Sequence, residues 1–259
     1  MSTTMAIEGT GRHQLSLTSL TRGFIFLLLP TRIQRITGRE MERGGAQKED
    51  MRKQWSCIRL AVEELSLFKP EEKKMSTLAF LGASNLLLHV LDMIGPTMMV
   101  LRQDIQRNIE RVEETYMLDP NLYSSLEEIV QKEVVGEGSA RQADSCCRSI
   151  LWLARSITFS LTLLDKIDKN PESSLEQVVE ETYNGTLKPW HGWISSAAYK
   201  VAIKLVPGRE MLIGLLMGQE QDYDDLKQDI KKYASLIQPL LDDTYQLLRT
   251  HELDRLKST

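Results

Sequence analysis

From about residue 49 onward, apolar side chains in this 259-residue chain recur at spacings of three and four. Trp55, Ile58, Val62 and Leu65 begin this pattern, which is typical of an amphipathic helix with one buried face. No stretch shows the period-two alternation of a half-buried β-strand. The sequence therefore predicts an all-α fold.

Capping residues and helix breakers divide this region into about eight predicted helices. The segment 78–94 is apolar nearly all round its helical surface, so we expect it to be deeply buried. Asp119 followed by Pro120 predicts a helix start, because Asp caps helices and Pro suits their first turn. The pattern Ser173-x-x-Glu176 predicts another start, as a capping box.

Residues 1–47 differ in composition from the rest of the chain. Glu8 is the only acidic residue up to Arg39, while arginines recur among many Ser and Thr. This is the composition of an organelle transit peptide; the alternatives are a disordered extension or translation from Met41 or Met51. The apolar run at 23–30 is far shorter than the ~20 residues of a membrane span. We divide the chain into an extension at 1–47, disordered or transit-like, and a helical domain at 48–259.

Charge and residue usage exclude several functions. The net charge of −4 gives no basic field for nucleic acid. Three cysteines, two of them adjacent, make a poor disulfide framework, so we expect a reducing compartment. The four histidines are scattered and no HExxH motif is present, so we expect no metal site. No nucleophile accompanies a base, and we therefore expect no catalytic residue, no cofactor and no enzyme activity.

A polar stripe lies on the predicted helix that starts at residue 96. Asp104, Asn108 and Arg111 occupy positions i, i+4 and i+7, at the border between an apolar and a charged face. An acceptor, an amide and a fork of donors side by side suit a hydroxylated head group. The alternative is a solvated helix edge with an internal Asp–Arg pair.

A second stripe combines an indole with two cations. Arg148, Trp152 and Arg155 share one face of a later helix at the same spacing. A Trp flanked by cationic groups can stack on a sugar ring or lie under an apolar chain. An ordinary boundary Trp with two snorkelling arginines is the alternative.

The sequence K-P-W-H-G-W at 188–193 places two tryptophans around a histidine at a predicted helix start. Trp193 near Lys188 at a loop tip suits a membrane interface, where an indole is half wet and half apolar. His191 can hydrogen-bond a ligand amide or carbonyl through a ring nitrogen. The alternative is a turn with a packed Trp.

In this order and spacing, the three motifs resemble the glycolipid transfer protein family. The matching patterns are D-x-x-x-N-x-x-R at 104–111, L-W-L-x-R at 151–155 and K-x-W-H-G-W at 188–193, and the resemblance runs from about Met51 to the C-terminus. It implies a two-layer helical sandwich that holds one sphingolipid, with its chains in an apolar pocket and its head group at a surface site. It also implies a cytoplasmic monomer that moves lipid between membranes through transient surface contact.

The resemblance assigns roles to particular residues. Trp152 would stack under the first sugar, and His191 would hold the ceramide amide carbonyl. It implies six head-group-binding residues and three membrane-contacting residues: Asp104, Asn108, Arg111, Arg148, Trp152 and His191, and Trp193, Tyr183 and Lys188.

One departure concerns the head group. Glycolipid binders of the family have Trp at the stacking position, whereas ceramide-1-phosphate binders have Arg there and a second Arg one turn earlier. This chain has Trp152 but also Arg148, and Arg148 with Arg111 could hold a phosphate. We expect the ligand to be a glucosyl- or galactosylceramide, because Trp152 stands in place of one of the two arginines that bind the phosphate. Ceramide-1-phosphate transfer and a sphingolipid sensor that transfers nothing are the alternatives.

Overall fold

The computed structural model describes residues 56–68, 75–136, 139–219 and 221–258. The predicted extension at 1–47, Trp55 and the alternative starts Met41 and Met51 lie outside these residues. The described part of the chain has no β-strand, and its nine α-helices compare with about eight predicted, so the all-α class is confirmed. They are α4 (Cys57–Ser66), α6 (Thr77–Ile94), α7 (Met99–Leu118), α8 (Leu126–Val135), α9 (Cys146–Lys169), α10 (Leu175–Thr186), α11 (Trp193–Ala202), α12 (Arg209–Leu216) and α13 (Tyr223–Thr250).

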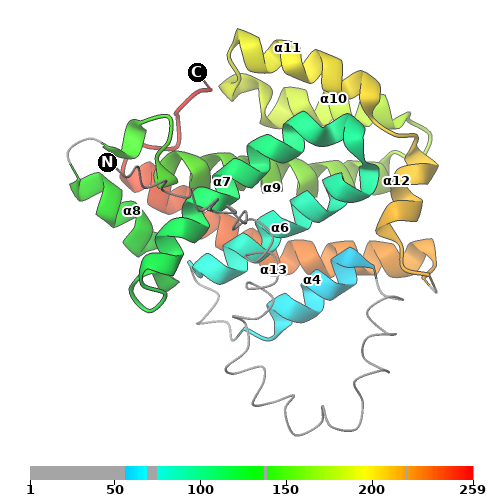
Figure 1. Ribbon diagram of the computed structural model, residues 1–259. Coiled ribbons are helices and arrows are strands. Elements are labelled where there is room, and N and C mark those ends of the chain that lie inside the picture. Colours follow the sequence, from blue (N-terminus) through cyan, green and yellow to red (C-terminus); the bar gives the residue numbers. More distant parts are fainter. Residues whose placement is uncertain (1–55, 69–74, 137–138, 220, 259) are drawn as a thin grey trace, which may run out of the picture. The chain divides into compact units, whose positions relative to one another are not determined.

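The helices pack as the predicted two-layer sandwich. Figure 1 shows α6 and α7 side by side in front of α9, with α13 behind them and α4 alongside α13. α9 packs against α6, α7, α8, α10 and α13, so it lies at the centre of the domain. Its inward face is fully buried at Ile150, Leu151, Leu153 and Ile157. This face makes α9 a rigid support for the side chains on its other face.

Two predicted helix starts are wrong. The Asp119 carboxylate accepts the backbone N–H groups of Asn121 and Leu122, which stabilises a short turn, and α8 begins only at Leu126 with Ser125 as its cap. The delay has a tertiary cause, because Leu126 donates its N–H to the Met75 carbonyl beside α6. Likewise, α10 is capped by Ser174.

The cap shifts away from Ser173 because that residue serves another element. Its carbonyl accepts hydrogen bonds from the Arg209 Nε and Nη2 atoms, at 3.2 and 2.9 Å. These hydrogen bonds connect the start of α12 to the turn before α10. The capping-box pattern in the sequence gives no sign of them.

Apart from Leu88, the buried residues of α6 lie in its first half, so the helix is less deeply buried than predicted. Phe80, Leu81 and Ala83 are buried, whereas Leu87 and Leu91 in the second half are half-buried. Among the described helices, α6 alone is long and apolar enough to cross a membrane, but core helices also meet this criterion. In this structure α6 packs against α4, α7, α9 and α12.

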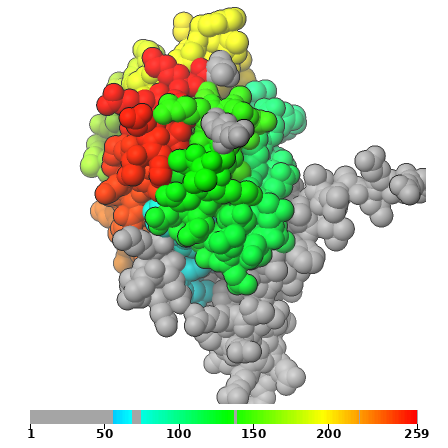
Figure 2. All heavy atoms as spheres, turned by 90° about the vertical axis from the view of Figure 1, so that its left-hand side faces the viewer, coloured from blue at the N-terminus to red at the C-terminus, as the bar shows by residue number. Residues whose placement is uncertain are grey.

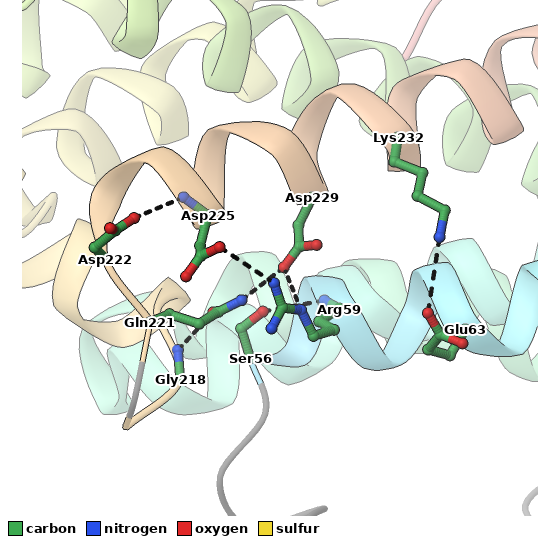
Figure 3. A network of polar contacts seen from close by, with 9 residues as sticks. All are labelled: Ser56, Arg59, Glu63, Gly218, Gln221, Asp222, Asp225, Asp229 and Lys232. Atoms are coloured by element: carbon green, nitrogen blue, oxygen red, sulfur yellow. Dashed lines mark hydrogen bonds and ion pairs between the residues drawn. The ribbon is translucent and has the colours of Figure 1, made fainter.

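A polar network joins α4 to the start of α13 (Figure 3). The buried Asp229 carboxylate accepts from Arg59 Nε at 2.9 Å and from Gln221 Nε2 at 2.7 Å. At the solvent edge of the same interface, Lys232 lies 3.8 Å from Glu63. The buried bonds should therefore stabilise the α4–α13 contact much more than the exposed ion pair.

Replacing Arg59 by alanine is expected to lower the free energy of unfolding by about 1–3 kcal/mol, since it leaves a buried carboxylate with one donor fewer. Lys232→Ala is the matched control, with an expected change within ~0.5 kcal/mol. Urea denaturation measures both values. Equal small losses would show that the buried carboxylate does not depend on Arg59.

The α6–α7 contact contains a carboxyl group with a perturbed pKa. Burial raises the pKa of Glu113 to about 7, and the charges of Glu110 and Glu114 act in the same direction. Asn85 Nδ2 lies 3.5 Å from the Glu113 carboxylate and opposes the shift. Because the folded state keeps this proton to higher pH than the unfolded chain does, the free energy of unfolding should fall as pH rises from about 4.5 to about 7.

Glu113→Gln is therefore expected to stabilise the protein at pH 8 by about 1–3 kcal/mol, after allowance for partial exposure, and to change little at pH 4.5. Thermal unfolding of both proteins at the two pH values measures this. A variant that is no more stable than wild type at pH 8 would show that Glu113 ionises there without cost.

Candidate functional site

The start of α9 is fixed by two independent caps. Ser145 Oγ accepts from the backbone N–H of Arg148, and the Glu133 carboxylate accepts from the N–H groups of Cys146 and Cys147 at 2.7 and 2.8 Å. These bonds satisfy donors that a helix N-terminus leaves unpaired. They set the position of the site residues that follow on α9.

The three cysteines are free thiols in the structure. Burial raises the pKa of each thiol above its usual range, to about 11 for Cys57. A protonated thiol is a poor nucleophile. The adjacent pair Cys146–Cys147 therefore acts in packing at the start of α9.

A cation lies between two indole rings at the centre of the site. The Arg155 guanidinium carbon is 4.8 Å from the Trp152 ring centroid and 4.1 Å from the Trp190 centroid. Arg155 is itself only 3% exposed, whereas Trp152 is half-buried. This contact holds both indoles in place. Trp190 was not among the predicted site residues, although it lies beside His191 in the K-P-W-H-G-W motif.

His191 lies next to Trp152, with the two ring centroids 5.4 Å apart. Its Nδ1 is 3.1 Å from the Tyr183 hydroxyl. Burial lowers the pKa of His191, the Arg155 charge lowers it further, and Asp104 opposes both. A neutral imidazole that accepts the Tyr183 proton at Nδ1 carries its own proton on Nε2 and can donate it to a ligand carbonyl.

The membrane contact predicted for Tyr183 is wrong. This residue is 3% exposed, and its ring stacks on Tyr199 of α11 with centroids 3.4 Å apart. A ring packed between α10 and α11 cannot insert into a bilayer. Tyr183 instead positions His191.

The polar stripe of α7 faces this cluster. Asn108 is buried and donates Nδ2 to the Asp104 carbonyl at 2.9 Å. Arg111 reaches Ser149 of α9, with 3.5 Å between Nη1 and Oγ. The Asp104 carboxylate is exposed, lies 3.8 Å from Arg107, and is close enough to His191 to affect its pKa. The structure thus brings together the three predicted motifs from α7, α9 and residues 188–193.

A fourth component, the segment after α13, was not predicted. Arg155 donates Nη1 to the Leu256 carbonyl and Nη2 to the Asp254 carbonyl, both at 2.7 Å. Arg148 is 8% exposed and donates to the Lys257 carbonyl. Figure 2 shows the red C-terminal segment beside the yellow-green and yellow surfaces of α10 and α11. The side chain of Arg148 is therefore engaged by the protein, and its predicted contact with a ligand stays a prediction.

The two remaining predicted membrane residues lie on the surface. Trp193 begins α11 and is 82% exposed, and Ile194 and Val201 on the same helix are exposed as well. Lys188 is exposed and donates Nζ to Asn184 Oδ1 at 2.9 Å. An exposed apolar helix face beginning with Trp is unusual for a surface in contact with water alone.

A set of half-buried apolar side chains packs against the hydrophobic core. They come from the second half of α6, from α9 beyond Trp152, and from the segments around α11 and α12: Leu86, Leu87, Val90, Leu91, Phe159, Leu161, Leu163, Ile203, Val206 and Ile213. An amphiphile needs both kinds of contact, polar groups for its head and apolar side chains for its chains.

The fold and the site together define an all-helical domain with a cluster of aromatic, cationic and polar side chains from α7, α9 and residues 188–193. The family described as Glycolipid transfer protein (GLTP) matches residues 75–218. Glycolipid transfer protein 3 of Arabidopsis thaliana is 41% identical over 220 residues, which cover 80% of this chain and 94% of that protein. Glycolipid transfer protein 2 of the same plant is 43% identical over 208 residues, covering 78% and 93%. This chain belongs to the glycolipid transfer protein family.

Solved structures show the same fold. The GLTP-fold structure that describes how FAPP2 selects simple glycosphingolipids is 25% identical, with a TM-score of 0.64 over 71% of this chain and 90% of that one. Human ceramide-1-phosphate transfer protein in complex with 12:0 ceramide-1-phosphate is 18% identical, with a TM-score of 0.65 over 76% and 98%. The fold is thus shared by proteins whose ligands differ in head group.

Proposed function

We propose that this protein carries one glycosphingolipid, of the glucosyl- or galactosylceramide type, between membranes. The observation that carries the proposal is the placement of Trp152 beside His191, with Arg155 holding the indole. An aromatic ring that is fixed and only partly buried is a platform for the apolar face of a sugar. The names of the plant relatives support a glycolipid.

Each polar residue of the site would bind a different part of the head group. Asp104 and Arg111 offer an acceptor and donors for sugar hydroxyls, and Asn108 retains its Oδ1 as an acceptor. His191 would donate Nε2–H to the ceramide carbonyl. Each buried polar group that a wrong ligand left unpaired would cost about 1–3 kcal/mol, which gives the site its selectivity.

The apolar chains explain why a carrier is needed. When a two-chain lipid passes through water, its chains are exposed to the solvent. This exposure costs a free energy of about 0.8 kcal/mol for each CH₂ group. An interior lined by apolar side chains of α6 and α9 replaces bilayer contacts with protein contacts and lowers that barrier. This role requires binding and release without any covalent step.

We expect a cytoplasmic monomer that touches membranes through Trp193 and Lys188. Trp193→Ala should reduce binding to vesicles containing anionic lipid by about 3- to 10-fold, which corresponds to the ~1 kcal/mol expected of an interfacial anchor. Thermal stability should be unchanged because the side chain packs against little. Val135→Ala on α8 is the control, since Val135 is also 82% exposed. Equal vesicle binding by both variants and wild type would exclude Trp193 as the anchor.

Native mass spectrometry tests the proposed ligand. The protein is incubated with vesicles that contain equal amounts of glucosylceramide, ceramide-1-phosphate and sphingomyelin, and is then separated from them. We expect a complex with a single glucosylceramide. Loading of ceramide-1-phosphate in preference would favour the alternative ligand, and a protein that extracts no lipid would contradict the proposal.

A further inference from the structure

We infer that the segment 254–258 controls which head group the site accepts, by occupying Arg148 and Arg155 with its backbone carbonyls. The inference rests on the proposed function, and concerns how the same site distinguishes a neutral sugar from an anionic phosphate. In the described residues, the hydrogen-bond acceptors of both guanidinium groups are carbonyls of this segment.

The two arginines form a cationic pair beneath the ligand platform. They are 8% and 3% exposed and lie one turn before and one turn after Trp152. Carbonyl oxygens accept one hydrogen bond from Arg148 and two from Arg155, and they leave both positive charges in place. A phosphate would form stronger, charge-assisted bonds with the same guanidinium groups. To reach them it would first have to displace the segment.

The segment is anchored at its far end by Ser258. The Ser258 N–H donates to the Trp190 carbonyl at 2.9 Å, and Ser258 Oγ accepts from the Gly192 N–H at 2.7 Å. Ser195 Oγ lies 3.0 Å from the same hydroxyl. These bonds join the segment to the turn that carries His191. They make its displacement costly, so the arginines are withheld from an anionic ligand while Trp152 stays available to a sugar.

The close approach at Gly192 provides a second way to loosen the segment. A Cβ added at this position would lie 3.3 Å from the Ser258 carbonyl oxygen. Gly192→Ala should therefore push the segment outward while the chain keeps its full length and both arginines. Gly185→Ala on α10 is the matched control, because a Cβ there meets nothing within 4 Å.

The test compares loading of glucosylceramide and ceramide-1-phosphate in wild type, a variant lacking residues 254–259, Gly192→Ala and Gly185→Ala. Circular dichroism confirms that each variant is folded. We expect the ratio of ceramide-1-phosphate to glucosylceramide to rise about tenfold or more in the truncated protein and to rise less in Gly192→Ala. Adding Arg148→Gln to the truncation should lower the ratio again. The ratio of Gly185→Ala should equal that of wild type.

An unchanged ratio in the folded variants, with wild type loading glucosylceramide, would overturn this inference alone. If the truncated protein does not fold, the lipid ratio of the Gly192→Ala variant is used for the same test. Failure of wild type to load either lipid would overturn the proposed function, and the inference with it.

Discussion

Trp152→Ala is expected to reduce glucosylceramide transfer by about 10- to 100-fold, because a central aromatic contact of this kind typically contributes 2 kcal/mol or more. The indole is half-buried, and Arg155 and His191 lie 4.8 and 5.4 Å from it. Its removal leaves the sugar without a platform. Transfer of a fluorescent glucosylceramide between vesicles measures the loss.

Trp152→Phe is the matched control, because it keeps an aromatic face of smaller area and should retain part of the activity. Unfolding curves of both variants show whether the domain is intact. Transfer by folded Trp152→Ala at the wild-type rate would remove Trp152 from the site. Preferential ceramide-1-phosphate transfer that persists in the variant would indicate that Arg148 and Arg111, and not Trp152, bind the head group.

Replacing Arg155 by alanine should cause the largest loss of stability among these variants, about 3–5 kcal/mol. The substitution leaves the Leu256 and Asp254 carbonyls without their donors, each at a cost of about 1–3 kcal/mol, and removes the cation between two indoles. Burial lowers the pKa of Arg155 to about 10, so the side chain is still charged at neutral pH. Guanidinium chloride unfolding measures the change.

Arg155→Lys should lie between the alanine variant and wild type, since an ammonium keeps the charge but not the planar fork that spans two carbonyls. Arg107→Ala is the surface control, with an expected change within ~0.5 kcal/mol because its side chain is 65% exposed. A loss for Arg155→Ala no larger than that of Arg107→Ala would show that the segment after α13 does not depend on this arginine.

The parts of the site that follow helical spacing could be predicted from the sequence. Asp104, Asn108 and Arg111 do lie along one side of α7, and Arg111 reaches Ser149 on α9. Tyr183 was misplaced because its membrane role was taken from the family resemblance and not from the periodicity of its helix. Val179 and Tyr183 lie one turn apart on the buried face of α10, so the periodicity of that helix carried the correct signal.

The segment after α13 could not be predicted, and the reason is chemical. Its contacts with Arg148 and Arg155 use backbone carbonyls, which every residue type supplies, so no pattern in residues 254–258 marks them. The shifted helix starts at Ser125 and Ser174 have a similar origin. The Met75 carbonyl accepts from the Leu126 N–H, and the Ser173 carbonyl accepts from Arg209. Only the tertiary structure shows these pairings.

Vesicle-to-vesicle transfer by the wild-type protein tests the central claim most directly. Labelled glucosylceramide, galactosylceramide and ceramide-1-phosphate are measured in parallel at equal protein concentration. The proposed function predicts transfer of the two glycosylceramides at rates well above that of ceramide-1-phosphate. A folded protein that binds glucosylceramide but leaves it in the donor vesicles would contradict the carrier function and identify a sphingolipid sensor instead.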